Sequence, residues 1–377
     1  MSRIRKRHNR KTGRLRTKRL RRFRLAGSVR GRRTARRRAA SFKPVPRSPA
    51  NAGMAQRAFE AGREAALHPG DGGNAGPLKR MNRCWNEWGA ANNASGLSWS
   101  AYHEIAGKFA DGFQHESGVR LNNPVLVQTG KTIGAVITAM NEEKAIPGVL
   151  EQLGRLPLDE TVVVVNGSAD HTFWSARNLS GGIVVHYMRP LGHDVGRAIG
   201  AKLIRSDIVL FLDGDFPIFA EHLVPYIHAV ERGADVVLND ITPYIDVFAG
   251  RDPVTIVKEM LNRSLGREDL RANSLTAVPH ALSRKAIDTI GCASLMVPPK
   301  AQALAVRGGL RVETAMSVDV ISKNRVRDKN SGRDNPVSHL IIGDHLEALE
   351  LLMRTDGARL ASADHIRNRN VLGRATS

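Results

Sequence analysis

The stretch Ile208-Val209-Leu210-Phe211-Leu212-Asp213-Gly214-Asp215 decides the fold class. Five apolar residues in a row are typical of a strand that is buried on both faces of a mostly parallel sheet. Two carboxylates follow with one glycine between them, so both can direct oxygens to one hard cation. An Asp-x-Asp alone is usually a solvated turn. Its position directly after a buried strand favours a ligand site, because open α/β sheets bind ligands beyond the carboxyl ends of their strands.

Outward from this stretch, short apolar runs alternate with amphipathic segments, which predicts an α/β fold: a mostly parallel sheet flanked by helices. The predicted strands are 133–138, 161–165, 182–187, 208–212 and 235–238, with a further strand over the alternating residues 312–320. The apolar spacing within 342–353 predicts a closing helix. Asp344 is expected to be its N-cap and His345 a residue of its first turn.

The N-terminal arm, residues 1–50, contains 21 of the 57 Lys and Arg residues and no Asp or Glu, so the net charge of +21 belongs entirely to it. It has too few apolar residues to offset the entropy of ordering, and we expect it to be disordered. Such an arm can bind an anionic polymer, namely nucleic acid or an acidic wall polymer, or an anionic lipid surface. A solvated tail without a partner is an equal alternative.

Residues 51–126 predict a small helical region, either an accessory unit or a linker, ahead of the main domain at 127–355 and a C-terminal tail at 356–377. Trp99, Tyr102, Phe109 and Phe113 share one helical face. That spacing favours packing against the main domain over a platform for sugars or bases.

Compartment and membrane signals are few. Cys84 and Cys292 have no partner at the spacing of a disulfide framework or a zinc site. No apolar run reaches the roughly 18 residues that span a bilayer, and no apolar segment follows the basic N-terminus. The sequence therefore predicts a cytoplasmic protein, with peripheral association with an anionic surface as an alternative.

Four motifs carry a family resemblance. They are Ile137-Thr-Ala-Met-Asn-Glu142, Asn166-Gly-Ser-Ala-Asp-His-Thr172, Gly196-Arg-Ala-Ile-Gly200 and Asp213-Gly-Asp215. In order and spacing they resemble the family 2 glycosyltransferases with the GT-A fold. Thr138 replaces the proline of the first family motif, and Asn166 replaces the aspartate of the second.

The resemblance implies a GT-A-like fold and a site for a nucleoside-diphosphate sugar donor. Thr138, Ala139 and Glu142 would line the base and ribose pocket, and Asn166 and Asp170 would face the base. Arg197 would approach the diphosphate, and Asp213 and Asp215 would hold Mn2+ or Mg2+. Asn141 is counted with the nucleotide-binding residues, and His345 is a further candidate metal ligand. The alternative roles are helix caps for Asn141 and Asp170 and a surface charge for Arg197.

The general base of inverting family members is missing, because Pro299-Lys300-Ala301 occupies its expected place. Asp240, after the fifth strand, is the nearest carboxylate that can deprotonate an acceptor hydroxyl. Transfer with retention, or loss of transfer, are the alternatives.

The sequence therefore predicts a metal-dependent glycosyltransferase that moves a sugar from a UDP or GDP donor to an unidentified hydroxyl acceptor. A nucleotidyltransferase is disfavoured, because the loop 138–143 is acidic and lacks glycine. The alternative that is not an enzyme is a catalytically degenerate surface or nucleic-acid-associated protein, in which the basic arm carries the function.

Overall fold

The computed structural model describes residues 49–67, 75–245, 247–321, 335–362, 364 and 367. The predicted basic arm lies outside the described residues except for Pro49 and Ala50, as does most of the predicted C-terminal tail.

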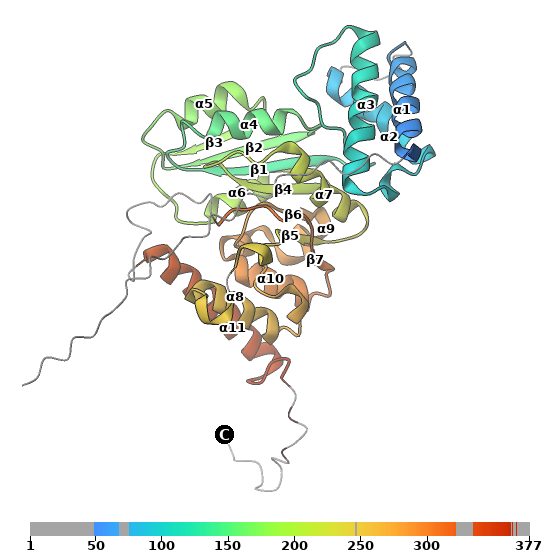
Figure 1. Ribbon diagram of the computed structural model, residues 1–377. Helices are drawn as coiled ribbons and strands as arrows, with labels where there is room; N and C mark the ends of the chain where they lie inside the picture. The colour runs from blue at the N-terminus through green and yellow to red at the C-terminus, as the bar shows by residue number, and fades with distance from the viewer. Residues whose placement is uncertain are drawn as a thin grey trace, which may run out of the picture. The chain divides into compact units, whose positions relative to one another are not determined.

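The described chain forms a mixed α/β structure whose elements are labelled in Figure 1. The strands are β1 Ile133–Ala139, β2 Glu160–Asn166, β3 Ile183–Tyr187, β4 Ile208–Asp213, β5 Val236–Leu238, β6 His280–Ser283 and β7 Val312–Thr314. The α-helices are α1 Pro49–Leu67, α2 Pro77–Ala91, α3 Trp99–Ser117, α4 Ile146–Gly154, α5 Thr172–Leu179, α6 Val195–Leu203, α7 Ala220–Glu231, α8 Pro253–Ser264, α9 Arg284–Ile290, α10 Pro298–Arg307 and α11 Pro336–Asp356. All five strands predicted between residues 133 and 238 are confirmed.

The strands form one seven-stranded sheet with the order β3-β2-β1-β4-β6-β5-β7. Strands β1 to β4 pair in parallel, and β7 pairs in parallel with β5. Strand β6, which the sequence did not predict, runs antiparallel between β4 and β5. The predicted mostly parallel sheet flanked by helices is therefore confirmed.

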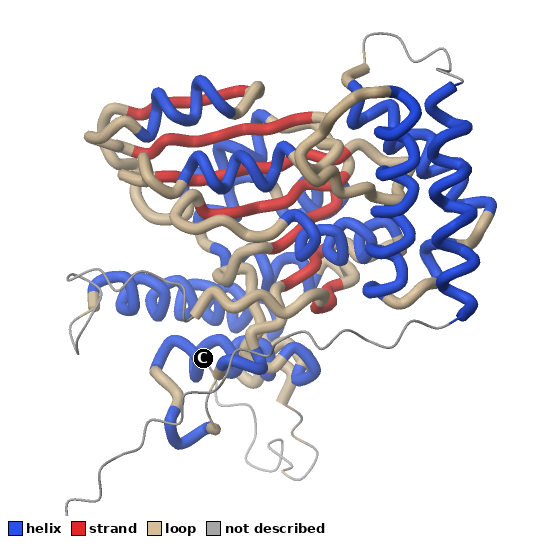
Figure 2. Tube along the Cα trace, turned by 45° about the horizontal axis from the view of Figure 1, so that its top comes forward, coloured by secondary structure: helices blue, strands red, loops and turns tan. Residues whose placement is uncertain are grey.

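Helices cover both faces of the sheet (Figure 2). One face buries its apolar side chains against α4, α5 and α7, and the same core continues into α1, α2 and α3. The other face is packed by α6, α9 and α10. Burial on both sides explains why β4 has a continuous apolar sequence.

Helices α2 and α3 pack on the main domain, as the aromatic spacing of α3 predicted, and α1 packs against α3. Trp85 Nε1 donates to the hydroxyl of Tyr102 at 2.9 Å, and that hydroxyl donates to the carbonyl of Leu126 at 3.1 Å. Asn82 Oδ1 accepts from the backbone N–H of Val127 at 2.7 Å. These buried bonds connect α2 and α3 to the segment that leads into β1.

The strand predicted over 312–320 is too long, because β7 ends at Thr314. Beyond it, the side chain of Asn239 takes the place of a neighbouring strand. Its Oδ1 accepts from the N–H of Val318 at 2.9 Å, and its Nδ2 donates to the carbonyl of Val318 at 3.0 Å. Tyr226 donates to the carbonyl of Met316 at 2.7 Å. Backbone bonds from Ala315 to Leu238 and from Asp240 to Met316 still continue the pairing, and at Val318 the side chain of Asn239 satisfies the backbone instead of a ladder.

The predicted start of the closing helix is also wrong. Helix α11 begins at Pro336, and Asn335 is its N-cap, accepting from the N–H groups of Val337 and Ser338. Asp344 and His345 therefore lie inside the helix, because a proline at the first helical position after an asparagine is a stronger start signal. Among the described residues, no helix combines the length and apolar composition needed to cross a bilayer.

Candidate active site at the carboxyl edge of the sheet

The carboxyl ends of β1, β2 and β4 meet at one edge of the sheet. In the register, Thr138 of β1 lies opposite both Val164 of β2 and Asp213 of β4. Thr138 Oγ1 donates to Asp213 Oδ1 at 3.0 Å. The structure thus brings together the first and last of the four family-like motifs.

Helix α6 approaches this edge closely because it has glycines on the face toward β1. A Cβ on Gly200 would lie 2.2 Å from Val136 Cγ1, and one on Gly196 would lie 2.8 Å from Thr138 Cγ2. No larger residue fits at either position without moving the helix away. This close packing places Arg197, on the same helix, beside the end of β4.

Arg197 is only 4% exposed, so it is not a surface charge. Its Nη1 lies 3.1 Å from Asp194 Oδ1 and donates to the carbonyl of Leu275 at 3.0 Å, while its Nη2 lies 3.6 Å from Asp213 Oδ1. Burial alone would lower the pKa of Arg197, but Asp194 and Asp213 together raise it above its ordinary value. The guanidinium is therefore a permanent buried cation at the edge, held between two carboxylates.

The turn after β4 is tight because Gly214 lies against the end of β1. A Cβ on Gly214 would be 2.8 Å from the Cβ of Ala139, and the N–H of Gly214 donates to the carbonyl of Thr138 at 2.8 Å. The side chain of Asp213 is 36% exposed at this turn. Carboxylates on both sides of Gly214 thus follow β4 at the edge where ligands bind in such sheets.

The loops after β1 and β2 are joined by reciprocal hydrogen bonds. Asn141, at a φ of 57°, donates its N–H to Ser168 Oγ at 3.0 Å and accepts from the N–H of Ala169 at 2.8 Å. The N–H of Glu143 donates to Asp170 Oδ2 at 3.2 Å, and that of Glu142 donates to Thr172 Oγ1 at 2.7 Å. Asn141 and Asp170 therefore connect the two loops and make them one surface beside Asp213.

Asn166 connects this surface to the loop after β3. Its Oδ1 accepts from the N–H of Leu191 at 2.8 Å, and its Nδ2 donates to the carbonyl of Gly192 at 2.8 Å. The side-chain amide of Asn166 thus uses one donor and one acceptor to bind the backbone of the loop after β3. It fixes the loop that leads to Asp194 and Arg197.

Asp240 follows β5, two strands from Asp213 and therefore roughly 10 Å along the edge. Its Oδ1 accepts from the N–H of Thr242 at 3.1 Å and from Asn273 Nδ2 at 3.2 Å. These donors orient the carboxylate. The structure places Asp240 at the same edge as the metal candidates but not in contact with them.

The C-terminal half of the chain, residues 239–345, contains a set of buried polar side chains. Its members are Asn239, Thr255, Asn262, Asn273, Ser274, His280, Gln302 and His345. Buried polar groups of this number are costly unless they are hydrogen-bonded. Asn262, for example, donates to the carbonyls of Arg271 and Asn273 and accepts from Gln302.

Two histidines of this set are held neutral. Burial lowers the pKa of His280 to about 3, with Arg197 acting in the same direction, and burial lowers the pKa of His345 to about 4. Nδ1 of His345 lies 2.7 Å from the carbonyl of Ile341, so it carries the proton and leaves Nε2 as an acceptor. Nε2 of both rings is buried with no hydrogen-bond partner among the described residues.

The described residues contain no group of three His, Cys, Asp or Glu side chains placed to hold one metal ion. His345 therefore does not join Asp213 and Asp215 in such a group. Its role as a ligand stays a prediction.

Two charged residues of this region were not among those predicted from the sequence. Asp194 lies three residues before Arg197, and this spacing could have indicated the pair. Lys258 lies on α8 near Arg197; burial lowers its pKa to about 8, with Arg197 acting in the same direction and Asp252 against it. No sequence signal distinguishes Lys258 from a surface lysine.

A known protein family matches the segment that runs from β1 through β6, including their loops at this edge. Residues 135–290 match the family described as glycosyl transferase family 2. The matched segment contains all four family-like motifs and Asp240, whereas His345 lies beyond it. The resemblance to family 2 glycosyltransferases predicted from the sequence is confirmed over this segment.

Solved structures similar to this chain include a glucosyl-3-phosphoglycerate synthase from Mycobacterium tuberculosis. Its complex with UDP is 19% identical, with 59% of this chain and 81% of that chain covered and a TM-score of 0.44. Its complex with Mn2+, UDP and phosphoglyceric acid is 21% identical, with 63% and 81% covered and a TM-score of 0.43. No curated protein sequence matches this chain.

Proposed function

We propose that this chain is a metal-dependent glycosyltransferase that moves a sugar from a nucleoside-diphosphate sugar, with UDP or GDP, to a hydroxyl acceptor. One observation carries the proposal. Within the family 2 segment, Thr138, Arg197 and Asp213 converge at the carboxyl edge of the sheet, next to the Gly214 turn. This arrangement combines oxygen ligands for a cation with a buried guanidinium, the groups that a diphosphate requires.

Asp213 and Asp215 would hold Mn2+ or Mg2+. A cation of this kind is commonly held by one or two carboxylates and completes its coordination with water and substrate phosphates. The two acids after β4 fit that requirement without a third protein ligand. The bound ion would supply neutralisation of the charge on the leaving nucleoside diphosphate.

Arg197 would stabilise the same leaving group from the side of α6. Because Asp194 and Leu275 hold Nη1, the guanidinium is fixed before substrate arrives, and little reorganisation is needed when negative charge develops. Thr138 would orient Asp213 through the 3.0 Å hydrogen bond.

The joined loops after β1 and β2 would bind the nucleoside. Ala139, the last residue of β1, lies directly against the turn at Gly214, and the buried Glu142 follows in the loop after β1. We assign both, with Thr138, to the base and ribose pocket. Asn141, Asn166 and Asp170 would shape that pocket through the loops they connect.

Asp240 would act as general base toward the acceptor hydroxyl. Its separation from Asp213 leaves room for a sugar between them, and Asn273 and Thr242 fix its orientation. His345 is not assigned to the proposed metal ion, because no third His, Cys, Asp or Glu among the described residues joins Asp213 and Asp215 in a metal group.

The proposal is tested by turnover. We expect the purified chain to release UDP or GDP from the matching sugar nucleotide in the presence of Mn2+, and addition of EDTA to abolish the release. Asp240→Asn should reduce kcat at least about 100-fold while KM for the donor changes little. Asp288→Asn, whose side chain is 67% exposed on α9, is the matched control and should behave as wild type. Metal-independent release, or equal kcat in D240N and D288N, would contradict the assignment.

A further inference from the structure

A separate cavity lies away from the carboxyl-edge residues described above. Its volume is about 220 Å³, and it is formed by the start of α3, the second half of α7 and the segment after β7. Its walls include Trp99, Tyr102, His228, Arg232 and Thr314. None of the residues assigned to the nucleotide, the metal or the acceptor lines it.

His228, one of the residues that line this cavity, has an unsatisfied ring nitrogen. Its Nε2 is buried and has no hydrogen-bond partner within the described part of the chain. The ring packs edge-on against Tyr102 with 4.8 Å between centroids, so its orientation is fixed. Burial lowers the pKa of His228 to about 4, and Arg232 acts in the same direction. At neutral pH a neutral imidazole therefore lies near the Arg232 cation, and none of the described residues that line the cavity is acidic.

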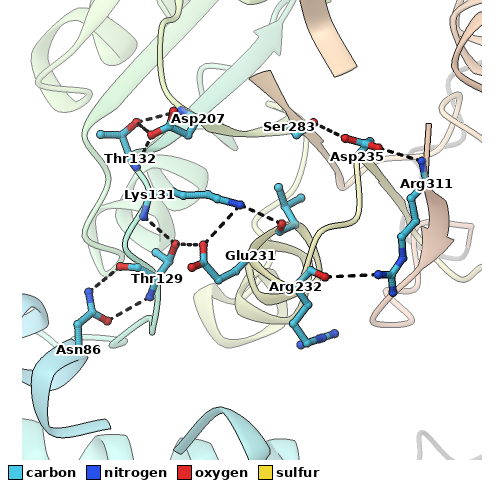
Figure 3. A network of polar contacts seen from close by, with 11 residues as sticks. Asn86, Thr129, Lys131, Thr132, Asp207, Glu231, Arg232, Asp235, Ser283 and Arg311 are labelled. Atoms are coloured by element: carbon cyan, nitrogen blue, oxygen red, sulfur yellow. Dashed lines mark hydrogen bonds and ion pairs between the residues drawn. The ribbon is translucent and has the colours of Figure 1, made fainter. Parts of the chain in front are cut away.

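Arg232 has an uncommitted guanidinium. Figure 3 shows its backbone carbonyl accepting from Arg311, while its side chain points away from the polar network. In that network Thr129 donates to Glu231 at 2.6 Å, and Lys131 lies 3.8 Å from the same carboxylate. The neighbouring charges thus compensate one another, whereas the Arg232 guanidinium makes no hydrogen bond or ion pair with a described residue.

The network fixes the C-terminal end of α7, which contains His228 and is directly followed by Arg232. Asn86 of α2 exchanges hydrogen bonds with the backbone of Thr129, and Lys131 Nζ donates to the carbonyl of Val230 at 3.3 Å. Arg311 anchors the carbonyl of Arg232 from the side of β7. The cavity wall is therefore preorganised, which reduces the entropy cost of binding a ligand there.

We propose that this cavity binds a single six-membered ring that carries one phosphate. Trp99 and Tyr102 supply an aromatic wall for the ring, Arg232 binds the phosphate, and Nε2 of His228 completes the polar contacts. The volume is below the roughly 300–1,000 Å³ typical of larger ligand pockets, so one ring is the size that fits. This inference is independent of the proposed transferase reaction.

Isothermal titration calorimetry with glucose 1-phosphate and phenyl phosphate tests the proposal. The full chain is titrated both with and without saturating UDP and Mn2+, so that a ligand of this cavity is distinguished from one of the proposed carboxyl-edge site. We expect at least one of the two compounds to bind, and Arg232→Gln to weaken its affinity at least about 10-fold. Arg177→Gln, an exposed arginine on α5, keeps the same net charge as R232Q and should bind as wild type.

An NMR titration of the His228 imidazole gives a second readout that does not depend on a substitution. A bound phosphate favours the imidazolium, so the pKa of His228 should rise from about 4 toward its ordinary value in the presence of the ligand. Binding of either compound with equal affinity in R232Q and R177Q would overturn the proposal. So would inorganic phosphate binding as tightly as both ring compounds, or no heat with any of the three at about 10 mM.

Discussion

Nη2 of Arg197 lies 3.6 Å from Oδ1 of Asp213, so a buried cation directly contacts one of the two acids assigned to the metal. If Asp213 holds a metal as proposed, a guanidinium this close would lower the negative charge available to the ion until a diphosphate enters. Under the same proposal the guanidinium would then face the phosphate oxygens. The pairing of Arg197 and Asp213 would therefore couple the stability of the edge to nucleotide binding.

Removing the Arg197 charge should destabilise the fold. Arg197→Gln leaves Asp194, 7% exposed, without its cation, and we expect the free energy of unfolding to fall by about 3–5 kcal/mol. Arg354→Gln is the control, since it breaks an exposed pair with Glu350 and should cost less than about 1 kcal/mol. Urea denaturation measures both. Equal free energies of unfolding for R197Q and R354Q would mean that the buried pair of Arg197 and Asp194 does not stabilise the fold.

Thr138 offers a finer test, because an equivalent threonine lies at the opposite edge. Thr138→Val removes the hydrogen bond to Asp213, and we expect the Mn2+-dependent affinity for UDP to fall roughly 5- to 10-fold. Thr132→Val removes a 2.6 Å bond to Asp207 at the amino end of the same two strands. It should lower stability without changing nucleotide affinity. Calorimetry on both variants separates the two effects, and an equal loss of affinity in T132V would refute a local role for Thr138.

Stability should fall in mild acid. His280 and His345 have pKa values near 3 and 4 in the folded chain, below the ordinary 6.5. The unfolded chain therefore binds protons first, so their contribution is full above about pH 6.5 and is lost as the pH falls toward 4. Each of the two histidines should lower the free energy of unfolding by about 1.4 kcal/mol per pH unit over that window. Urea titrations between pH 7.5 and 4.5 measure the slope, which should be shallower in His280→Gln and His345→Gln. Unchanged slopes in both variants would contradict the assignment of these groups.

The sequence predicted the parallel half of the sheet well because β1, β2 and β4 are largely apolar runs followed by polar loops. In β4, all residues from Ile208 to Leu212 are buried, and composition alone reveals that environment. Strand β6 has four residues, begins with His280 and ends with Ser283, so no periodicity distinguishes it from a loop. Its pairing depends on β4 and β5 already being in place.

The candidate site was predictable where its residues follow strands and not where they depend on packing. Asp213 and Asp215 follow β4 in the sequence itself. The burial of Arg197 depends on the absent side chains at Gly196 and Gly200, which only the distance of α6 from β1 reveals. Likewise, the end of β7 depends on Asn239, a side chain more than 70 positions away from the segment it binds.

Metal-dependent nucleotide binding tests the central claim most directly. We predict that calorimetry will detect binding of UDP or GDP to the full chain in Mn2+, and that removal of the metal or Asp215→Ala will abolish it, while Asp288→Asn binds normally. Nucleotide affinity that is the same with and without Mn2+, or the same in D215A and D288N, would contradict the claim that the acids after β4 hold a cation against the diphosphate.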